Sequence, residues 1–531
     1  MTHFNSIFLT RRPKPFYPLK ADRRSSGKRG SGDLITRGMG LQDFPGTAVL
    51  LDKTQQTNLR KLFFPPLILL ECLNEICPRG PSRKASDAPP NPNQSPEEMF
   101  QTLVNKLAQV CDFEPKGNTV TALAVIRDNG RICYIFASNR RSKVPLKNCR
   151  EGLTAVLNIL KVNIEANMRD SDEVMENRLL NEILFWNNVR VRAYLTSLTK
   201  ELQTCIKRCN TGDLEGRSAS EALQRLESLL PDVTSGQKSD RYIGSTIQCI
   251  KAIQESKRSP LQRYIEARAV EDDNMVKGGC WATLQHSAGR LLSYQYAAQT
   301  LVHAHHIWAD TELFRDFEVQ SVRSGGSYPA EALKLLPESA EAIINRAPGY
   351  TPAETNAHRQ HAADLQRYDL DAKLEEKWAY KLDPVIHAEM LLHDWLARTE
   401  GGTQPYRFFN NWQYIGTSKP TCRLCQEYFN IIATPVRVRA GHPNTYTNWR
   451  LPDMWVDGKS NSSASAELER KSWCEIQGKM KRRVYADLVC VLEEKVSDKK
   501  PNDSNTYTER ITGIGGGVNQ LANWLAGVQL R

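Results

Sequence analysis

Four residues in the last third of the chain could together hold a metal ion and use it for hydrolysis. His387 and Glu389 form an H-x-E motif, and Cys422 and Cys425 follow later with two residues between them. One imidazole and two thiolates suit Zn²⁺, and three protein ligands leave the fourth tetrahedral position open, as in catalytic zinc sites. A carboxylate beside such a site can accept a proton from water and pass it to a leaving group. The pattern predicts a zinc centre with His387, Cys422 and Cys425 as metal ligands and Glu389 as the proton carrier.

A structural zinc site is the main alternative. His442 lies 17 residues after Cys425 and could be a fourth ligand, which would close the coordination shell and leave no position for water. Glu389 favours the open site, because a closed site has no use for a carboxylate at that position. The alternative function that goes with the closed site is a non-catalytic zinc-binding interaction module with a basic tail.

Helix N-termini are expected to present these ligands. Asp383 and Pro384 are typical of the N-cap and first position of a helix, which would place His387 in its first turns. Pro420 precedes the two cysteines in the same way, and residues 412–417 between the two motifs have strand character. A helix N-terminus carries partial positive charge, which favours a thiolate over a thiol. The sequence therefore predicts a helix–strand–helix unit with metal ligands at both helix N-termini.

A helix and a β-hairpin are predicted at residues 95–140. Ser95 and Glu98 form a capping box around a proline, which is a strong signal for a helix start. Two β-rich runs, 120–126 and 132–137, then flank an Asn-Gly pair, the best short-range signal for a hairpin turn. The first run is apolar on both faces, which indicates a strand covered on both sides in a layered α/β sheet.

Most of the remaining chain is predicted to be helical or disordered. Apolar residues recur with helical periodicity between the two core segments, and clear strands are few there. The N-terminal region is rich in Gly, Ser, Pro and basic residues, with one short apolar helix near 59–76. The predicted parts are a basic, mostly disordered N-terminal region (1–94), the first part of the core (95–140), a helical insertion (141–382), the metal-binding part of the core (383–460), and a C-terminal helix and tail (461–531).

The charge of the chain is concentrated at its N-terminus. Residues 1–40 contain nine Lys or Arg against two Asp, so they carry +7 of the net charge of +11, and the other 491 residues carry only +4. Such a tail could bind nucleic acid, direct import into an organelle, or keep the protein soluble.

Neither a membrane span nor an export signal is predicted. The most apolar run, 63–73, is short and interrupted by two prolines, and the N-terminus lacks an apolar stretch of signal-peptide length. The 13 cysteines show no paired framework. They are therefore expected to be mostly reduced thiols in an intracellular protein, cytoplasmic or nuclear.

The joined motifs resemble a known superfamily. H-x-E followed by P-x-C-x-x-C is similar to the signature of the cytidine-deaminase-like proteins, H-x-E followed by P-C-x-x-C. More narrowly, the runs IHAEMLL and YIGTSKPTCRLC resemble the OTT-type deaminases, a largely fungal set predicted to act on nucleic acids or nucleotides. Thr421, between Pro420 and Cys422, departs from the general signature in a way that this group shares. The resemblance covers residues 383–455, and residues 95–140 fit the start of the same core.

This resemblance implies a fold and an activity. The superfamily core runs helix, hairpin, zinc helix, strand, zinc helix and further strands. The predicted fold class is therefore α/β, with a cytidine-deaminase-like three-layer α/β/α core, a large helical insertion and a disordered N-terminal tail. The implied reaction is zinc-dependent hydrolytic deamination of a nucleobase in a nucleotide or nucleic acid. The base, the choice between free nucleoside, RNA and DNA, and the oligomeric state stay open.

Two further residues are assigned to substrate binding by the same resemblance. An Asn just after the second strand often contacts the substrate in the superfamily, and Asn139 is similarly placed. Ala388, inside the H-x-E motif, is the second assigned residue. The insertion leaves the core after Asn139 and returns at the zinc helix, so both its ends should lie beside the metal. It could then cover the pocket or dock a large substrate. The alternative is a helical domain on the far side of the sheet.

Overall fold

The computed structural model of the protein describes most of the chain. The described residues are 40–76, 93–115, 117–165, 171–209, 212–233, 239–275, 279–326, 328, 334–380, 382–456 and 463–493. The chain divides into two units, Met1–Gly40 and Leu41–Arg531, and all the elements below belong to the second. Of the region 1–94 predicted to be mostly disordered, residues 1–39 and 77–92 lie outside the described residues, whereas residues 41–76 form two strands and three helical elements, more than the one short helix expected near 59–76. The predicted tail after residue 493 also lies outside the described residues.

A six-stranded mixed sheet organises the second unit. Its strand order is β1-β5-β4-β3-β6-β7. The neighbours β3–β4 and β3–β6 are antiparallel, whereas β1–β5, β4–β5 and β6–β7 are parallel. A second, two-stranded sheet pairs β2 with β8. The strands are β1 (Leu41–Gln42), β2 (Thr47–Val49), β3 (Thr121–Asp128), β4 (Arg131–Ser138), β5 (Phe317–Val322), β6 (Tyr414–Thr417), β7 (Arg437–Val438) and β8 (Met454–Val456).

The hairpin and the helix before it form as their sequence predicts. Asn129 and Gly130 both have positive φ, 49° and 79°, and join β3 to β4 in the tight turn that this pair favours. Helix α3 (Pro96–Val110) begins with the expected capping box, in which Ser95 and Glu98 bond each other's backbone N–H.

Helices cover both faces of the sheet, so the predicted three-layer α/β/α core is confirmed. Successive residues of a strand point to opposite faces. Leu123 and Val125 of β3 belong to one apolar core together with α3, whereas Ala122 and Ala124 belong to a second core together with α14 (Ala388–Arg398).

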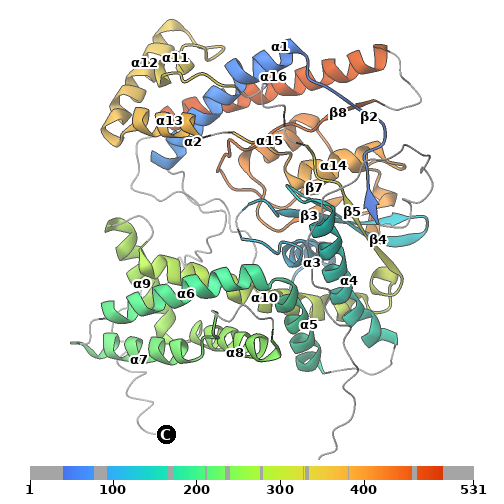
Figure 1. The fold of residues 1–531 in the computed structure, drawn as a ribbon, viewed down its shortest axis with the longest axis vertical. Coiled ribbons are helices and arrows are strands. Elements are labelled where there is room, and N and C mark those ends of the chain that lie inside the picture. The colour runs from blue at the N-terminus through green and yellow to red at the C-terminus, as the bar shows by residue number, and fades with distance from the viewer. Residues whose placement is uncertain are drawn as a thin grey trace, which may run out of the picture. The chain divides into compact units, whose positions relative to one another are not determined.

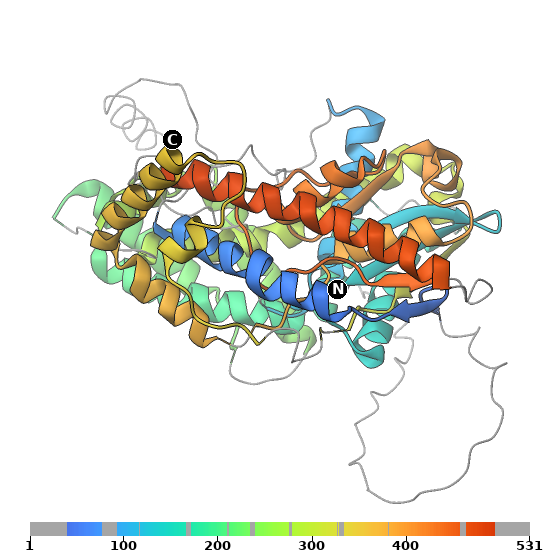
Figure 2. The same ribbon diagram turned by 90° about the horizontal axis from the view of Figure 1, so that it is seen from above.

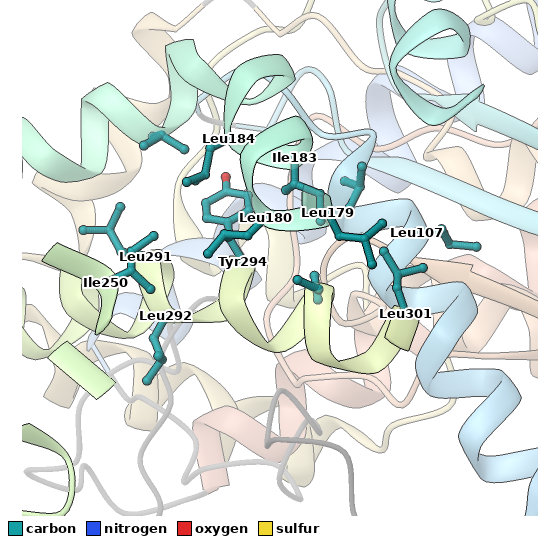
Figure 3. Packing of buried hydrophobic residues seen from close by; sticks show 14 of the residues in the cluster. Leu107, Leu179, Leu180, Ile183, Leu184, Ile250, Leu291, Leu292, Tyr294 and Leu301 are labelled. Atoms are coloured by element: carbon teal, nitrogen blue, oxygen red, sulfur yellow. The ribbon is translucent and has the colours of Figure 1, made fainter. Parts of the chain in front are cut away.

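Seven helices and α3 share the first core. Figure 1 shows helices α5 to α10 gathered below the sheet, and Figure 3 shows Leu180 of α5 next to Tyr294 of α10, with Leu107 of α3 nearer to Leu179 and Leu301. Each fully buried leucine contributes about 1.5–3 kcal/mol to folding. The seven helices are α4 (Lys143–Glu165), α5 (Asp172–Trp186), α6 (Asn188–Arg208), α7 (Leu214–Ser228), α8 (Asp240–Ser256), α9 (Pro260–Met275) and α10 (Cys280–Trp308).

The second core lies on the other face and combines segments that are far apart in the sequence. Helices α2 and α16 pack against each other, and Figure 2 shows them side by side. None of the described helices is long and apolar enough to cross a membrane. The helical elements of this face are α1 (Lys53–Asn58), the π-helix η2 (Leu59–Phe63), α2 (Phe64–Ile76), α11 (Ala340–Ile344), α12 (Pro352–Asp364), α13 (Leu370–Ala379), α14, α15 (Arg423–Ile432) and α16 (Ser463–Glu493).

The segment 141–382 does more than add helices. Its helices α4 to α10 lie on the face opposite α14, its helices α11 to α13 join the second core, and its strand β5 pairs with β4 inside the sheet. The sequence gives little sign of this strand, because its buried positions include the polar Gln320 and Ser321. The strand forms because its backbone pairs with that of β4, although its polar side chains do not indicate a buried strand.

Gly416 in β6 gives a test of the packing between the sheet and α3. A Cβ at this position would lie 2.7 Å from the carbonyl carbon of Val104 and 2.8 Å from the backbone nitrogen of Asn105, and neither backbone atom can move easily. Gly416→Ala should therefore destabilise the protein by about 1–3 kcal/mol through overpacking. A fall in the thermal unfolding midpoint would measure it.

Gly478 in α16 is the matched control. The nearest atom to a Cβ there is the end of the flexible Arg482 side chain, at 3.9 Å. Gly478→Ala should leave the unfolding midpoint unchanged or raise it, since alanine favours a helix interior by about 0.5–1 kcal/mol over glycine. Equal midpoints for the two variants would contradict the packing described for Gly416.

Candidate metal centre

His387, Cys422 and Cys425 meet at one point between two helix N-termini. His387 is the N-cap residue of α14, Cys422 is the N-cap residue of α15, and Cys425 lies in the first turns of α15. The Nδ1 atom of His387 lies 3.5 Å from Sγ of Cys422 and 3.4 Å from Sγ of Cys425. One ligand atom from each residue lies within 4.8 Å of the others. The three residues can therefore bind one metal ion.

The chain enters α14 differently from the prediction. Asp383 was expected to cap the helix and Pro384 to open it, but α14 begins only at Ala388. The Asp383 carboxylate instead pairs with Arg140, and Val385 forms a parallel bridge with Trp449. These distant partners hold the residues before His387 in an extended conformation and delay the start of the helix.

Helix α15 shows the same displacement. Pro420 was expected to lie at the helix start, but the helix begins at Arg423. Thr421 forms a parallel bridge with Gly441, and its carbonyl accepts a hydrogen bond of 2.9 Å from the N–H of His442. On both arms, extended pairing continues up to the ligand, so the ligand itself becomes the N-cap residue.

The electrostatics of the cluster favour a charged sulfur. Burial raises the pKa of Cys422, but its hydrogen bond with Cys425 and the charge of His387 lower the pKa to well below its usual value. Burial also raises the pKa of Cys425, and the contact with Cys422 adds to that rise. Burial lowers the pKa of His387, but Cys422 and Glu389 more than offset this effect. A thiolate beside an imidazole is the donor set that a metal ion of the zinc type prefers.

Glu389 is buried beside the cluster without belonging to it. Its side chain is 4% exposed, and burial raises its pKa even though His387 acts in the opposite direction. The group of potential ligands found among the described residues contains His387, Cys422 and Cys425 but not Glu389. A buried carboxyl group next to a metal site, and not needed as a ligand, can carry protons.

Asn139 and Ala388, the two residues assigned to substrate binding, lie in direct contact. The side-chain oxygen of Asn139 accepts a hydrogen bond of 2.8 Å from the N–H of Ala388. The side-chain nitrogen of Asn139 donates to the carbonyl of Gly117 at 3.1 Å. Asn139 thus satisfies the first N–H of α14 and fixes the helix start beside His387. Substrate contact by either residue stays a prediction.

His442 is not a member of the ligand group found among the described residues. Its Nδ1 accepts a hydrogen bond of 3.2 Å from the N–H of Asn444, and its ring lies 5.9 Å from the ring of Tyr446. Among the described residues, the cluster therefore has three potential ligands, and His442 lies in the adjacent loop.

Several residues that contact the cluster were not identified from the sequence, because they belong to no recognisable motif. The indole N–H of Trp449 donates to Sγ of Cys425 at 3.3 Å, the sulfur of Met390 lies 3.4 Å from the same Sγ, and the ring of Tyr446 lies 6.4 Å from that of His387. Trp449 and Tyr446 belong to the loop between β7 and β8, where periodicity gives no signal. Their position depends on tertiary contacts alone.

Helix α2 holds that loop from outside. The Glu71 carboxylate accepts a hydrogen bond of 2.9 Å from the N–H of Thr447, and the Asn74 amide donates to the hydroxyl of Thr445 at 3.1 Å. Glu71 is itself paired with Lys377 of α13 at 2.9 Å. Residues from the N-terminal region thus help to place the loop that borders the cluster.

A buried carboxylate ties the helical segment to the arm that carries the cysteines. Asp112 accepts hydrogen bonds from the hydroxyls of Thr119 at 2.7 Å and Ser418 at 3.0 Å. Arg190 of α6 forms an ion pair with the same carboxylate, and both side chains are buried. Breaking one side of such a pair typically costs about 3–5 kcal/mol. Helix α6 is therefore strongly linked to the loop that leads to Cys422.

Comparisons with known proteins agree with this geometry. Residues 386–453 match the model of a family described as OTT_1508-like deaminase. No curated protein and no solved structure matched the chain. The matched segment contains all three potential metal ligands and Glu389. The predicted resemblance is thus confirmed for this segment, whose similarity to a deaminase family is consistent with the OTT-type, cytidine-deaminase-like family.

Proposed function

We propose that the chain is a zinc-dependent hydrolytic deaminase that removes the amino group of a nucleobase in a nucleotide or nucleic acid. One observation carries the proposal: within the segment that matches a deaminase family, His387, Cys422 and Cys425 converge beside the buried Glu389. A non-catalytic zinc module would need a fourth protein ligand. Among the described residues the ligand group has three members, and this supports the catalytic reading.

The residues present fit zinc. One imidazole nitrogen and two sulfurs suit Zn²⁺, and the low pKa of Cys422 supplies a thiolate. Zinc held by His387, Cys422 and Cys425 would supply the Lewis acidity that makes water a nucleophile near neutral pH. The N-terminus of α15 helps to hold Cys422 as a thiolate, because a backbone hydrogen bond from Cys425 and the helix dipole both favour negative charge there.

Glu389 would move the protons. Its carboxylate accepts a proton from the water that attacks the amino-bearing carbon of the base. It passes this proton to the ring nitrogen, then takes the second proton of the former water from the newly added hydroxyl and passes it to the departing amine, so that the carbonyl forms, the carbon–nitrogen bond breaks and ammonia leaves. The raised pKa of Glu389 supports this role, because a carboxyl group that both accepts and donates protons works best near the ambient pH.

Ala388 and Asn139 are proposed to border the substrate. Ala388 lies between the metal ligand and the proton carrier, and Asn139 fixes its N–H. Both polar atoms of the Asn139 amide already bind the protein. Direct contact between Asn139 and a substrate therefore requires Asn139 to share one of these hydrogen bonds. The substrate class is the finer part of the proposal, and a nucleotide or nucleic acid is the class that known deaminases of this type imply.

Zinc binding provides the first test. Cys422→Ser should lose most of the zinc, because serine is a poor ligand for zinc and removes one of three donors. Elemental analysis of the purified protein measures the result. Cys474→Ser is the control, since Cys474 is an exposed free cysteine on α16. Undiminished zinc in Cys422→Ser would rule out the proposed ligand set.

The proton role of Glu389 provides the second test. Glu389→Gln should keep its zinc but lower the rate of ammonia release about 10²–10⁴-fold, the range typical of general acid–base groups. Glu427→Gln is a matched control. Glu427 is also a buried carboxylate, on α15, the helix that carries Cys425, but it pairs with Arg423 and Arg483. This variant should release ammonia at a rate close to that of the unmodified protein.

The substrate is identified by testing the candidates side by side in separate reactions. Nucleosides, nucleotides and single-stranded oligonucleotides, each with cytosine or adenine, are incubated with the zinc-loaded protein, and ammonia is measured. Release from one class that depends on Glu389 would support the proposal. If the zinc-loaded protein releases ammonia from none of them, deamination of these bases is excluded. Loss of zinc in Glu389→Gln would show instead that Glu389 is a ligand.

A further inference from the structure

Trp449 is a large and fully buried side chain next to the metal cluster. It is 0% exposed, and its indole N–H donates a hydrogen bond to Sγ of Cys425 at 3.3 Å. A buried indole N–H generally requires an acceptor, because leaving it unsatisfied costs the desolvation energy of the group. The acceptor here is one of the three potential metal ligands.

The backbone of Trp449 reaches the other ligand arm. The N–H of Val385 donates to the carbonyl of Asn448 at 3.0 Å, and the N–H of Arg450 donates to the carbonyl of Val385 at 3.0 Å. Val385 lies two residues before His387. Trp449 therefore connects both arms: its backbone pairs beside His387, and its side chain binds Cys425.

One contact holds the indole ring of Trp449, and another holds the residue that follows it. The ring of Phe63, at the end of η2, lies 5.9 Å from it. On the adjacent residue, the Arg450 side chain is 2% exposed and bonds both carboxylate oxygens of Asp453, at 2.6 and 3.1 Å. Neither the ring nor its backbone can move without breaking buried contacts, so the N–H is held in place before any metal binds.

We propose that Trp449 is a positioning residue of the metal centre, which holds the sulfur of Cys425 in the orientation that metal binding requires. The proposal rests on the zinc site of the proposed function and adds a residue that no motif indicates. An N–H donor also withdraws charge from a thiolate and so tunes its bond to the metal. Loss of such an outer partner typically weakens metal binding about 10–100-fold.

Trp449→Phe separates this role from simple packing. Phenylalanine keeps an aromatic ring but removes the N–H, so zinc affinity should fall about 10–100-fold in a titration against a competing chelator. With Co²⁺ in place of Zn²⁺, the sulfur-to-cobalt charge-transfer band should also shift, because the band reports the charge on the sulfur. Neither readout depends on catalytic activity.

Trp473→Phe is the matched control. Trp473 is 6% exposed, and its indole N–H donates to the carbonyl of Pro452 at 3.1 Å, so the same chemical change removes a hydrogen bond that involves no potential ligand. This variant should keep the zinc affinity and the cobalt spectrum of the unmodified protein. An equal loss of zinc affinity in both variants would assign the effect to general destabilisation and overturn the proposal.

A second variant covers the case in which Trp449→Phe fails to fold. Replacement of Trp449 by benzothienylalanine keeps the shape of the bicyclic ring and substitutes sulfur for the N–H. Zinc affinity and a cobalt spectrum equal to those of the unmodified protein would refute the positioning role. The unmodified protein distinguishes the two proposals: if it binds neither zinc nor cobalt, the proposed function fails, whereas binding that is insensitive to Trp449 overturns only this inference.

Discussion

The convergence of two helix N-termini is the constraint on which the rest of the structure depends. Three ligand atoms must lie within 4.8 Å of one another, yet they come from separate helices joined through a strand. Each helix starts at its ligand because extended pairing holds the preceding residues: Val385 against Trp449, and Thr421 against Gly441. The central strands β3 and β6 then provide the surface on which α14 packs. A cluster built in this way is preorganised, so metal binding does not have to order the chain.

The cluster lies within a much larger system of supports. The segment that matches the deaminase family is 386–453, but the contacts that fix its loops come from far outside it. Glu71 and Asn74 of α2 hold the loop after β7, and Arg190 of α6 pairs with Asp112, which binds Ser418 before Cys422. Buried charges of this kind are tolerated only when they are fully paired. The added helices are therefore integral to the core, and their removal would leave charged or polar groups of the core without partners.

The two groups of helices in the segment 141–382 lie on different sides of the sheet. Helices α4 to α10 share the core of α3, opposite the helices that carry the potential metal ligands, whereas α11 to α13 pack on the same side as those helices, against α2 and α16. The ends of the segment do meet beside His387, as Asn139 binds Ala388 and Arg140 pairs with Asp383. The alternative of a helical domain on the far side of the sheet therefore describes the position of α4 to α10, but not that of α11 to α13.

Local chemistry in the sequence determined the elements whose signals lie within a few residues. Three of these signals act within a few residues of the chain. The capping box of Ser95 and Glu98 and the Asn-Gly turn both form as expected, and the two closely spaced cysteines lie together with His387. Tertiary structure decided what depends on competition between distant partners. Asp383 is a good N-cap residue, but the guanidinium of Arg140 takes its carboxylate, so the helix begins at Ala388 instead. β5 and the indole of Trp449 are likewise fixed by partners that are remote in sequence, β4 and Cys425. A local pattern records which bonds a residue can make, whereas only the folded chain determines which partner is close enough to make them.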